Sequence, residues 1–250
     1  MDIWTLCDGL AHITTITDDF LRIVESQQQI ATSRIVDDLD EQALLESLLE
    51  NSKPPLSADT RHLHYLLATP FRYPPLKHGS RFGQQHERSL FYGSKSIETL
   101  LAEASYYRFV FWSGMATPPK SGQFITEHTV FAARYYTASG VLLHQPPFNQ
   151  YATDISNPAA YAIPQQLGAS MRGAGVQALE YVSARDVKNG INIALYSPDA
   201  LSVNEPLFAE QWICRTSADI VRYATRKANE VFSYSIQQFY VDGSLPEPAI

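Results

Sequence analysis

Apolar residues recur at helical spacing in three segments of the chain. In residues 5–31 the spacing is loose and predicts one or two helices. Residues 37–51 predict a clearer amphipathic helix, with acidic side chains in its first turn, where the helix dipole favours them, and a stripe of leucines. The third helix is expected over residues 97–111, because either Ser94 or Ser96 can cap it.

The second half of the chain alternates between apolar and polar residues in several short runs. Residues 176–182 and 191–196 are expected to be paired strands, joined by a turn at Asn189 and Gly190, a strong hairpin signal. Other strands are expected at residues 90–92, 126–136, 141–143, 208–215 and 220–224, and a further helix at residues 157–171. Helices mixed with short, mostly antiparallel strands indicate the α+β class.

The prolines at positions 54 and 55 end the acidic helix and mark a domain boundary. We expect residues 1–60 to form an acidic helical extension and residues 61–250 to form the main domain. Residues 1–50 carry a net charge of −9, whereas the whole chain carries −7. The extension is interpreted either as a helical cap over the main core or as a docking surface for a partner or a second copy of the chain.

The composition, 45% hydrophobic and 18% charged, is that of a folded globular protein. Two cysteines are too few for a disulfide framework or a cysteine metal site, and His62 and His64 lack an acid-rich partner motif, so no metal is expected. The N-terminus has no secretory signal and the chain has no run of about 18 apolar residues, so we expect a cytoplasmic protein without a membrane segment. The charge disfavours direct binding of nucleic acid.

Candidate chemistry is concentrated around a cationic, glycine-punctuated turn at residues 79–83. The surrounding residues 71–95 contain five cations and one acid, in a chain that is acidic as a whole. A local excess of positive charge indicates an anionic ligand. Glu103, on the helix expected next, lies at the edge of the apolar stripe, where a carboxylate faces either a cleft or solvent.

These segments resemble the RES domain, a family named for an arginine, a glutamate and a serine. The resemblance rests on Gly79-Ser-Arg-Phe-Gly83, Phe91-Tyr92-Gly-Ser94 and Ala102-Glu103-Ala-Ser-Tyr-Tyr-Arg108, and on residues 180–195 for the serine-bearing segment. It covers about residues 65–215. The resemblance implies an ADP-ribosyltransferase-like fold, built on a split antiparallel sheet, for the main domain.

The resemblance also implies a function, since RES proteins are toxins of bacterial toxin-antitoxin pairs that consume NAD. It makes Glu103 the catalytic acid, places Arg81 at the phosphates and Tyr92 in the aromatic wall, and makes Ser183 a supporting hydroxyl. The full set of catalytic and substrate-binding residues that it implies is Glu103, Arg81, Tyr92, Ser183, Arg72 and Asn192. The implied partner is an antitoxin with an Xre-type helix-turn-helix DNA-binding domain, and a homodimer is left open.

The residue types suit this chemistry on physical grounds. The nicotinamide of NAD is already a cationic leaving group, so its cleavage needs stabilisation of an oxocarbenium-like ribose, which a carboxylate supplies. An arginine fork binds two phosphate oxygens at once. We therefore expect an NAD glycohydrolase or phosphorylase, with NAD as substrate and no cofactor. The alternatives are a mono-ADP-ribosyltransferase that modifies a protein and a non-catalytic interaction module with the same fold.

Overall fold

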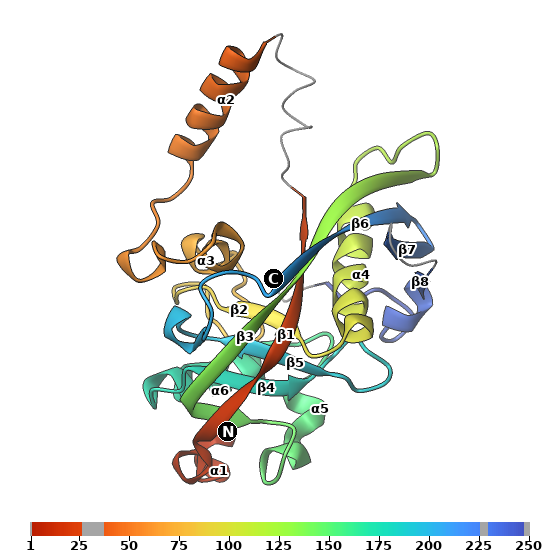
Figure 1. Cartoon of the computed structure of the whole chain (residues 1–250). Helices are drawn as coiled ribbons and strands as arrows, with labels where there is room; N and C mark the ends of the chain where they lie inside the picture. Colours follow the sequence, from red (N-terminus) through yellow and green to blue (C-terminus); the bar gives the residue numbers. More distant parts are fainter. Residues whose placement is uncertain (1, 27–37, 226–229, 248–250) are drawn as a thin grey trace.

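The computed structural model describes residues 2–26, 38–225 and 230–247, which form one large sheet with helices around it (Figure 1). The helices are α1 (Ile3–Leu6), α2 (Leu39–Ser52), α3 (Tyr65–Arg72), α4 (Ile97–Ser113), α5 (Ala152–Ile155) and α6 (Ala162–Gly173). The strands are β1 (Thr14–Glu25), β2 (Phe91–Ser94), β3 (Gln123–Leu142), β4 (Ala178–Val182), β5 (Ile191–Leu195), β6 (Phe208–Ser217), β7 (Ile220–Thr225) and β8 (Val231–Ser235). Among these residues, no helix combines the length and the apolar character needed to cross a membrane.

The strand order of the sheet is β1-β2-β5-β4-β3-β6-β7-β8, and β1 also pairs with β3. The named pairs are antiparallel, apart from β3 and β4, which run parallel. β1 pairs with β3 along its length but meets β2 at one described register pair, Leu21 with Ser94. β1 therefore joins the two sides of the sheet, and the predicted α+β fold with a mostly antiparallel sheet is confirmed.

The helices predicted over residues 5–31 are wrong for most of that range. After α1 and a short 3-10 helix, residues 14–25 form β1, and residues 27–31 lie outside the described part of the chain. The segment is rich in threonine, isoleucine and valine, which favour strands, and its pairing with β3 outweighs the loose helical spacing. Residues 14–25, which we expected to belong to the helical extension, thus form a strand of the main sheet.

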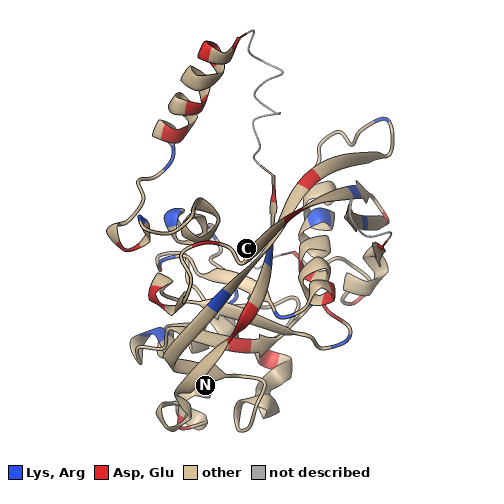
Figure 2. Cartoon of the chain, viewed as in Figure 1, with Lys and Arg blue, Asp and Glu red and all other residues tan. Residues whose placement is uncertain are grey.

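The helix predicted over residues 37–51 is confirmed as α2 for its described residues. Asp38 caps it by accepting hydrogen bonds from the backbone N–H groups of Asp40 and Glu41. No residue of α2 is buried, and Leu44 and Leu48 are 61% and 58% exposed. The interpretation of this helix as a cap over the core is therefore wrong. Figure 2 shows acidic residues, coloured red, along the ribbon of α2, which stands away from the sheet.

The helix expected over residues 97–111 is confirmed as α4, with Ser96 as its cap. Its buried face differs from the predicted stripe, because Tyr106 and Phe109 are buried whereas Tyr107 and Phe111 are exposed. Tyr106 and Phe109 belong to a hydrophobic cluster with side chains of β6 and β7, which fixes the rotation of the helix.

The remaining predicted elements are confirmed with small changes. β4 and β5 form the predicted antiparallel pair, but residues 183–190 connect them, a longer loop than a two-residue Asn-Gly turn. Asn189 in this loop has a positive φ of 56°. The two strands expected at 126–136 and 141–143 are parts of the single strand β3. The helix expected from residue 157 begins later, at Ala162.

We expect Phe20→Ala to destabilise the whole protein. Phe20 of β1 is 1% exposed and its ring contacts that of Phe91 at 5.2 Å between centroids. Loss of a buried phenylalanine typically lowers the free energy of unfolding by about 3–5 kcal/mol. Urea denaturation measures this value, with the exposed Leu44→Ala as the control that leaves it nearly unchanged. Equal, small effects of both variants would show that β1 is not part of the core.

Candidate active site

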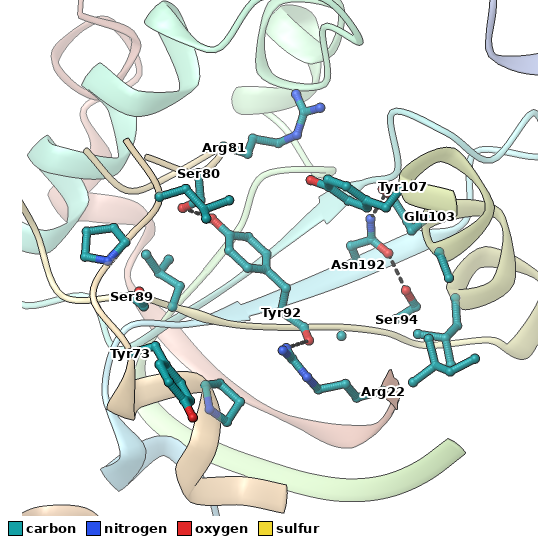
Figure 3. Close-up of a pocket in the computed structure, with 18 of the residues that line it drawn as sticks. Arg22, Tyr73, Ser80, Arg81, Ser89, Tyr92, Ser94, Glu103, Tyr107 and Asn192 are labelled. Carbon is teal, nitrogen blue, oxygen red and sulfur yellow. Dashed lines mark hydrogen bonds between the residues drawn. The ribbon is translucent and has the colours of Figure 1, made fainter. Parts of the chain in front are cut away.

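A pocket of about 610 Å³ lies between α4, β1, β2 and the turn that precedes β2. Its volume is typical of sites for small molecules. Four of the predicted site residues line it, namely Arg81, Tyr92, Glu103 and Asn192. Figure 3 shows them around one cavity, with Glu103 and Asn192 side by side.

The carboxylate of Glu103 is held through one of its two oxygens. Oε1 accepts hydrogen bonds from Ser183 Oγ at 2.6 Å and from Asn192 Nδ2 at 2.7 Å. Both donors are buried. No side chain in the described part of the chain forms a hydrogen bond with Oε2. The carboxylate is therefore oriented by the protein and keeps one oxygen for a ligand.

The two donors are themselves fixed by the sheet. Ser94 and Asn192 are register partners on β2 and β5, and Ser94 Oγ donates to Asn192 Oδ1 at 2.7 Å. Ser183 follows directly after β4, where its Oγ accepts from the backbone N–H groups of Arg185 and Asp186. The geometry around Glu103 thus follows from how β2, β4 and β5 pair.

Arg81 carries a positive charge that is held by uncharged groups. Its Nη1 donates to the carbonyl oxygens of Ile155 at 3.2 Å and Asn157 at 2.8 Å. Its guanidinium lies 4.7 Å from the ring centre of Tyr161, and the residue is buried. Among the described residues no carboxylate forms an ion pair with Arg81. An anion in the pocket would supply the missing negative charge.

Tyr92 ties the glycine turn to the sheet. Its phenol oxygen lies 2.9 Å from Ser80 Oγ and accepts from the backbone N–H of Phe82 at 3.0 Å. Burial raises the pKa of Tyr92 to about 12, so the phenol is neutral at physiological pH. Gly79 has a φ of +72°, and a Cβ there would meet the carbonyl oxygen of Gly83 at 2.3 Å, so this turn requires glycine.

Arg72, which the sequence analysis placed at the substrate, does not line the pocket. Its Nη1 pairs with Glu50 Oε1 of α2 at 2.7 Å, and its Nε donates to the carbonyl oxygen of Pro54. The side chain therefore points to the connection between α2 and α3. The next residue, Tyr73, lines the pocket instead.

The structure adds an arginine that the sequence analysis missed, Arg22 of β1. Its Nη1 donates to the carbonyl oxygen of Tyr92 at 2.7 Å, and its guanidinium lies 4.9 Å from the ring centre of Phe91. The buried Nε has no hydrogen-bond partner among the described residues. Burial lowers the pKa of Arg22 to about 10, so it is still charged at neutral pH. The sequence signal that could have identified Arg22 was the set of β-branched residues in this segment, which favour a strand over a helix. Arg22 reaches the pocket because the segment forms a strand.

Tyrosines also missed by the sequence analysis complete the walls of the pocket, and they are Tyr73, Tyr107, Tyr161 and Tyr181. Within residues 2–26, 38–225 and 230–247, no group of three or more histidine, cysteine or acidic side chains is placed to hold a metal ion.

The fold and the pocket define an α+β protein with one oriented carboxylate in a cavity of small-molecule size. The model of the RES domain family matches residues 55–219, which is more than half of the chain, and the protein belongs to the RES domain family. This match confirms the resemblance to the RES domain that the sequence analysis stated. β1, which carries Arg22, lies before the matched residues.

Comparison with curated proteins gives no match. Among solved structures, the chain is similar to one described as the crystal structure of the M. tuberculosis MbcT-MbcA toxin-antitoxin complex. The sequence identity is 9% and the TM-score is 0.48, over 83% of this chain and 90% of that chain.

His128 also lines the pocket, and its environment keeps the imidazole neutral. The ring is buried on β3 and its Nε2 lies 2.9 Å from Thr126 Oγ1. Burial and then the charge of Arg108 lower the pKa of His128 from 6.5 to about 4.

We expect His128→Gln to reduce the loss of stability in acid. A depressed folded pKa stabilises the protein above the unfolded pKa of 6.5, and this contribution disappears as the pH falls toward 4. At about 1.4 kcal/mol per pKa unit, the wild-type protein loses ~3 kcal/mol of unfolding free energy from this group across that range. Urea denaturation at a series of pH values measures the difference between the two proteins. Parallel curves between pH 7 and pH 4 would refute the assignment.

Proposed function

We propose that this protein is an enzyme that breaks the nicotinamide–ribose bond of NAD and acts as the toxin of a bacterial toxin-antitoxin pair. The observation that carries the proposal is the carboxylate of Glu103, oriented by Ser183 and Asn192 in a pocket that also contains Arg81. NAD is the substrate, and the reaction uses no further cofactor.

The proposed chemistry follows from the charges in the reaction. When the bond breaks, its electron pair leaves with nicotinamide, which becomes neutral, and positive charge develops on the ribose. The carboxylate of Glu103 stabilises that charge, while its Oε2 accepts a hydrogen bond from a ribose hydroxyl. Because Ser183 and Asn192 already fix Oε1, little reorganisation is needed when the charge appears.

Two arginines are suited to the diphosphate of NAD. Arg81 and Arg22 lie on either side of Tyr92 in Figure 3, and both line the pocket. Each donates its hydrogen bonds to carbonyl oxygens rather than to carboxylates. A diphosphate supplies the negative charge that both guanidinium groups lack. In this proposal Arg22 takes the role that the sequence analysis gave to Arg72.

Membership of the RES domain family supports the biological part of the proposal. The implied partner is an antitoxin with an Xre-type helix-turn-helix domain, and the implied compartment is the cytoplasm, which contains NAD. Either water or phosphate receives the ADP-ribosyl group.

We expect Glu103→Gln to lower the rate of nicotinamide release from NAD by about 10² to 10³, as loss of a preorganised electrostatic group does. The matched control is Glu98→Gln, which neutralises an exposed carboxylate on the same helix. Assay of the purified proteins with labelled NAD gives the rate, and expression in bacteria should arrest growth with wild type and control only. Full activity of the Glu103→Gln variant, or label that moves onto protein, would contradict the proposed reaction.

We expect Arg22→Gln to weaken the binding of ADP-ribose, a ligand with the same diphosphate, by about tenfold or more, since hydrogen bonds to charged groups contribute about 1.5–3 kcal/mol. Arg72→Gln is the comparison, because Arg72 does not line the pocket and should leave the affinity within about twofold of wild type. Titration calorimetry measures both affinities. The opposite ranking of the two variants would return the phosphate-binding role to Arg72.

A further inference from the structure

An ion pair between Arg108 of α4 and Glu25 at the end of β1 lines the pocket together with His128. Arg108 is held by neutral groups on three sides. Its Nε donates to Thr216 Oγ1 at 3.3 Å and its Nη2 to Thr126 Oγ1 at 3.2 Å. Its guanidinium lies 4.8 Å from the ring centre of Phe124. The position of this cation is therefore fixed without the help of Glu25.

The carboxylate partner of Arg108 is held much less firmly. Glu25 Oε2 pairs with Arg108 Nη1 at 3.0 Å, but the side chain of Glu25 is 58% exposed whereas that of Arg108 is 12% exposed. An ion pair with so exposed a carboxylate contributes little stability, because water solvates the free carboxylate well. Glu25 can therefore turn into solvent at small cost and leave a buried guanidinium facing the pocket.

The neighbouring groups favour an oxyanion at this place. His128 shares Thr126 with Arg108 and is neutral at physiological pH, so it adds neither repulsion nor a competing negative charge. With Glu25 turned away, the cluster carries one positive charge. The planar guanidinium then offers the N–H group released by Glu25, a geometry suited to phosphate oxygens.

We propose that Arg108 forms a phosphoryl-binding subsite of the pocket, which Glu25 covers in the unliganded protein and leaves when the ligand binds. Arg108 follows Glu103 by five residues on α4, about 7.5 Å along the helix axis and about 140° around it. Both residues nevertheless line the same pocket, so one ligand can reach Arg108 with a phosphoryl group and Glu103 with a sugar. This inference rests on the proposed function for the identity of that sugar.

The phosphoryl group has two possible sources. One is free phosphate that accepts the ADP-ribosyl group: a phosphate oxygen forms a bond to the ribose carbon, the bond to the nicotinamide nitrogen breaks, and its electron pair leaves with nicotinamide. The other source is the diphosphate of NAD itself. Both place an oxyanion where the carboxylate of Glu25 now lies.

The test is Glu25→Gln, which removes the carboxylate that competes with a phosphoryl group for Arg108. This variant should bind the phosphoryl ligand more tightly, whereas partial unfolding would weaken binding. The matched control is Asp19→Asn. Asp19 is also a carboxylate of β1 paired with an arginine, Arg134, but neither residue lines the pocket. Titration calorimetry of the full chain measures affinity for ADP-ribose, and thermal unfolding in phosphate against chloride at equal ionic strength measures affinity for free phosphate.

We expect Glu25→Gln to tighten the binding of one ligand by about threefold to tenfold. Arg108→Lys, which keeps the charge but loses the planar fork, should weaken the same ligand. Tighter binding of phosphate alone identifies the free acceptor, and tighter binding of ADP-ribose alone identifies the diphosphate of the substrate. The proposal fails if Glu25→Gln matches Asp19→Asn for both ligands, or if wild type binds neither.

The two proposals can fail separately. If NAD is cleaved but Glu25→Gln behaves like Asp19→Asn, the subsite is refuted and the enzymatic function stands. If NAD is not cleaved but Glu25→Gln still tightens phosphate binding, the function is refuted and the subsite stands.

Discussion

The site depends on the hydrogen bonds that hold one oxygen of Glu103. A carboxylate in a pocket is costly unless hydrogen bonds replace its water, and here two buried side chains, Ser183 and Asn192, do so. Those two side chains are fixed in turn by Ser94 and by backbone N–H groups after β4. A shift of one residue in the register of β2 against β5 would separate Ser94 from Asn192 and release the carboxylate.

Four arginines of the structure fall into two groups according to their partners. Arg72 and Arg134 are paired with carboxylates at the surface, and their charges are neutralised within the protein. Arg81 and Arg22 are held by carbonyl oxygens and aromatic rings, which fix their positions without cancelling their charges. Binding a ligand anion to the second kind breaks no ion pair. For these four arginines the partners, rather than the place in a sequence motif, show whether an anion can bind without breaking an ion pair.

Three of the predicted signature residues line one pocket because their placement along the chain is mostly local. Arg81 and Tyr92 belong to a turn and the strand after it, and Glu103 lies on the helix that follows a recognisable cap. The outcome for Arg72 was different because adjacent residues at a helix end point about 100° apart, so that Tyr73 faces the pocket while Arg72 faces α2. Motif spacing alone does not resolve that difference.

The failure at β1 has a different cause, and it changes how the pocket is understood. β1 is a strand because it pairs with β3, more than a hundred residues away, and the β-branched residues that favour a strand there do not identify this partner. The same pairing brings Arg22 and Glu25 into the pocket, although both lie before the residues matched by the RES domain model. β1 lies between β2 and β3, and its Phe20 packs against Phe91 of β2, the residue next to Tyr92. The N-terminal segment is therefore part of the structural support for the signature, and the pocket as a whole extends beyond the residues that identify the family.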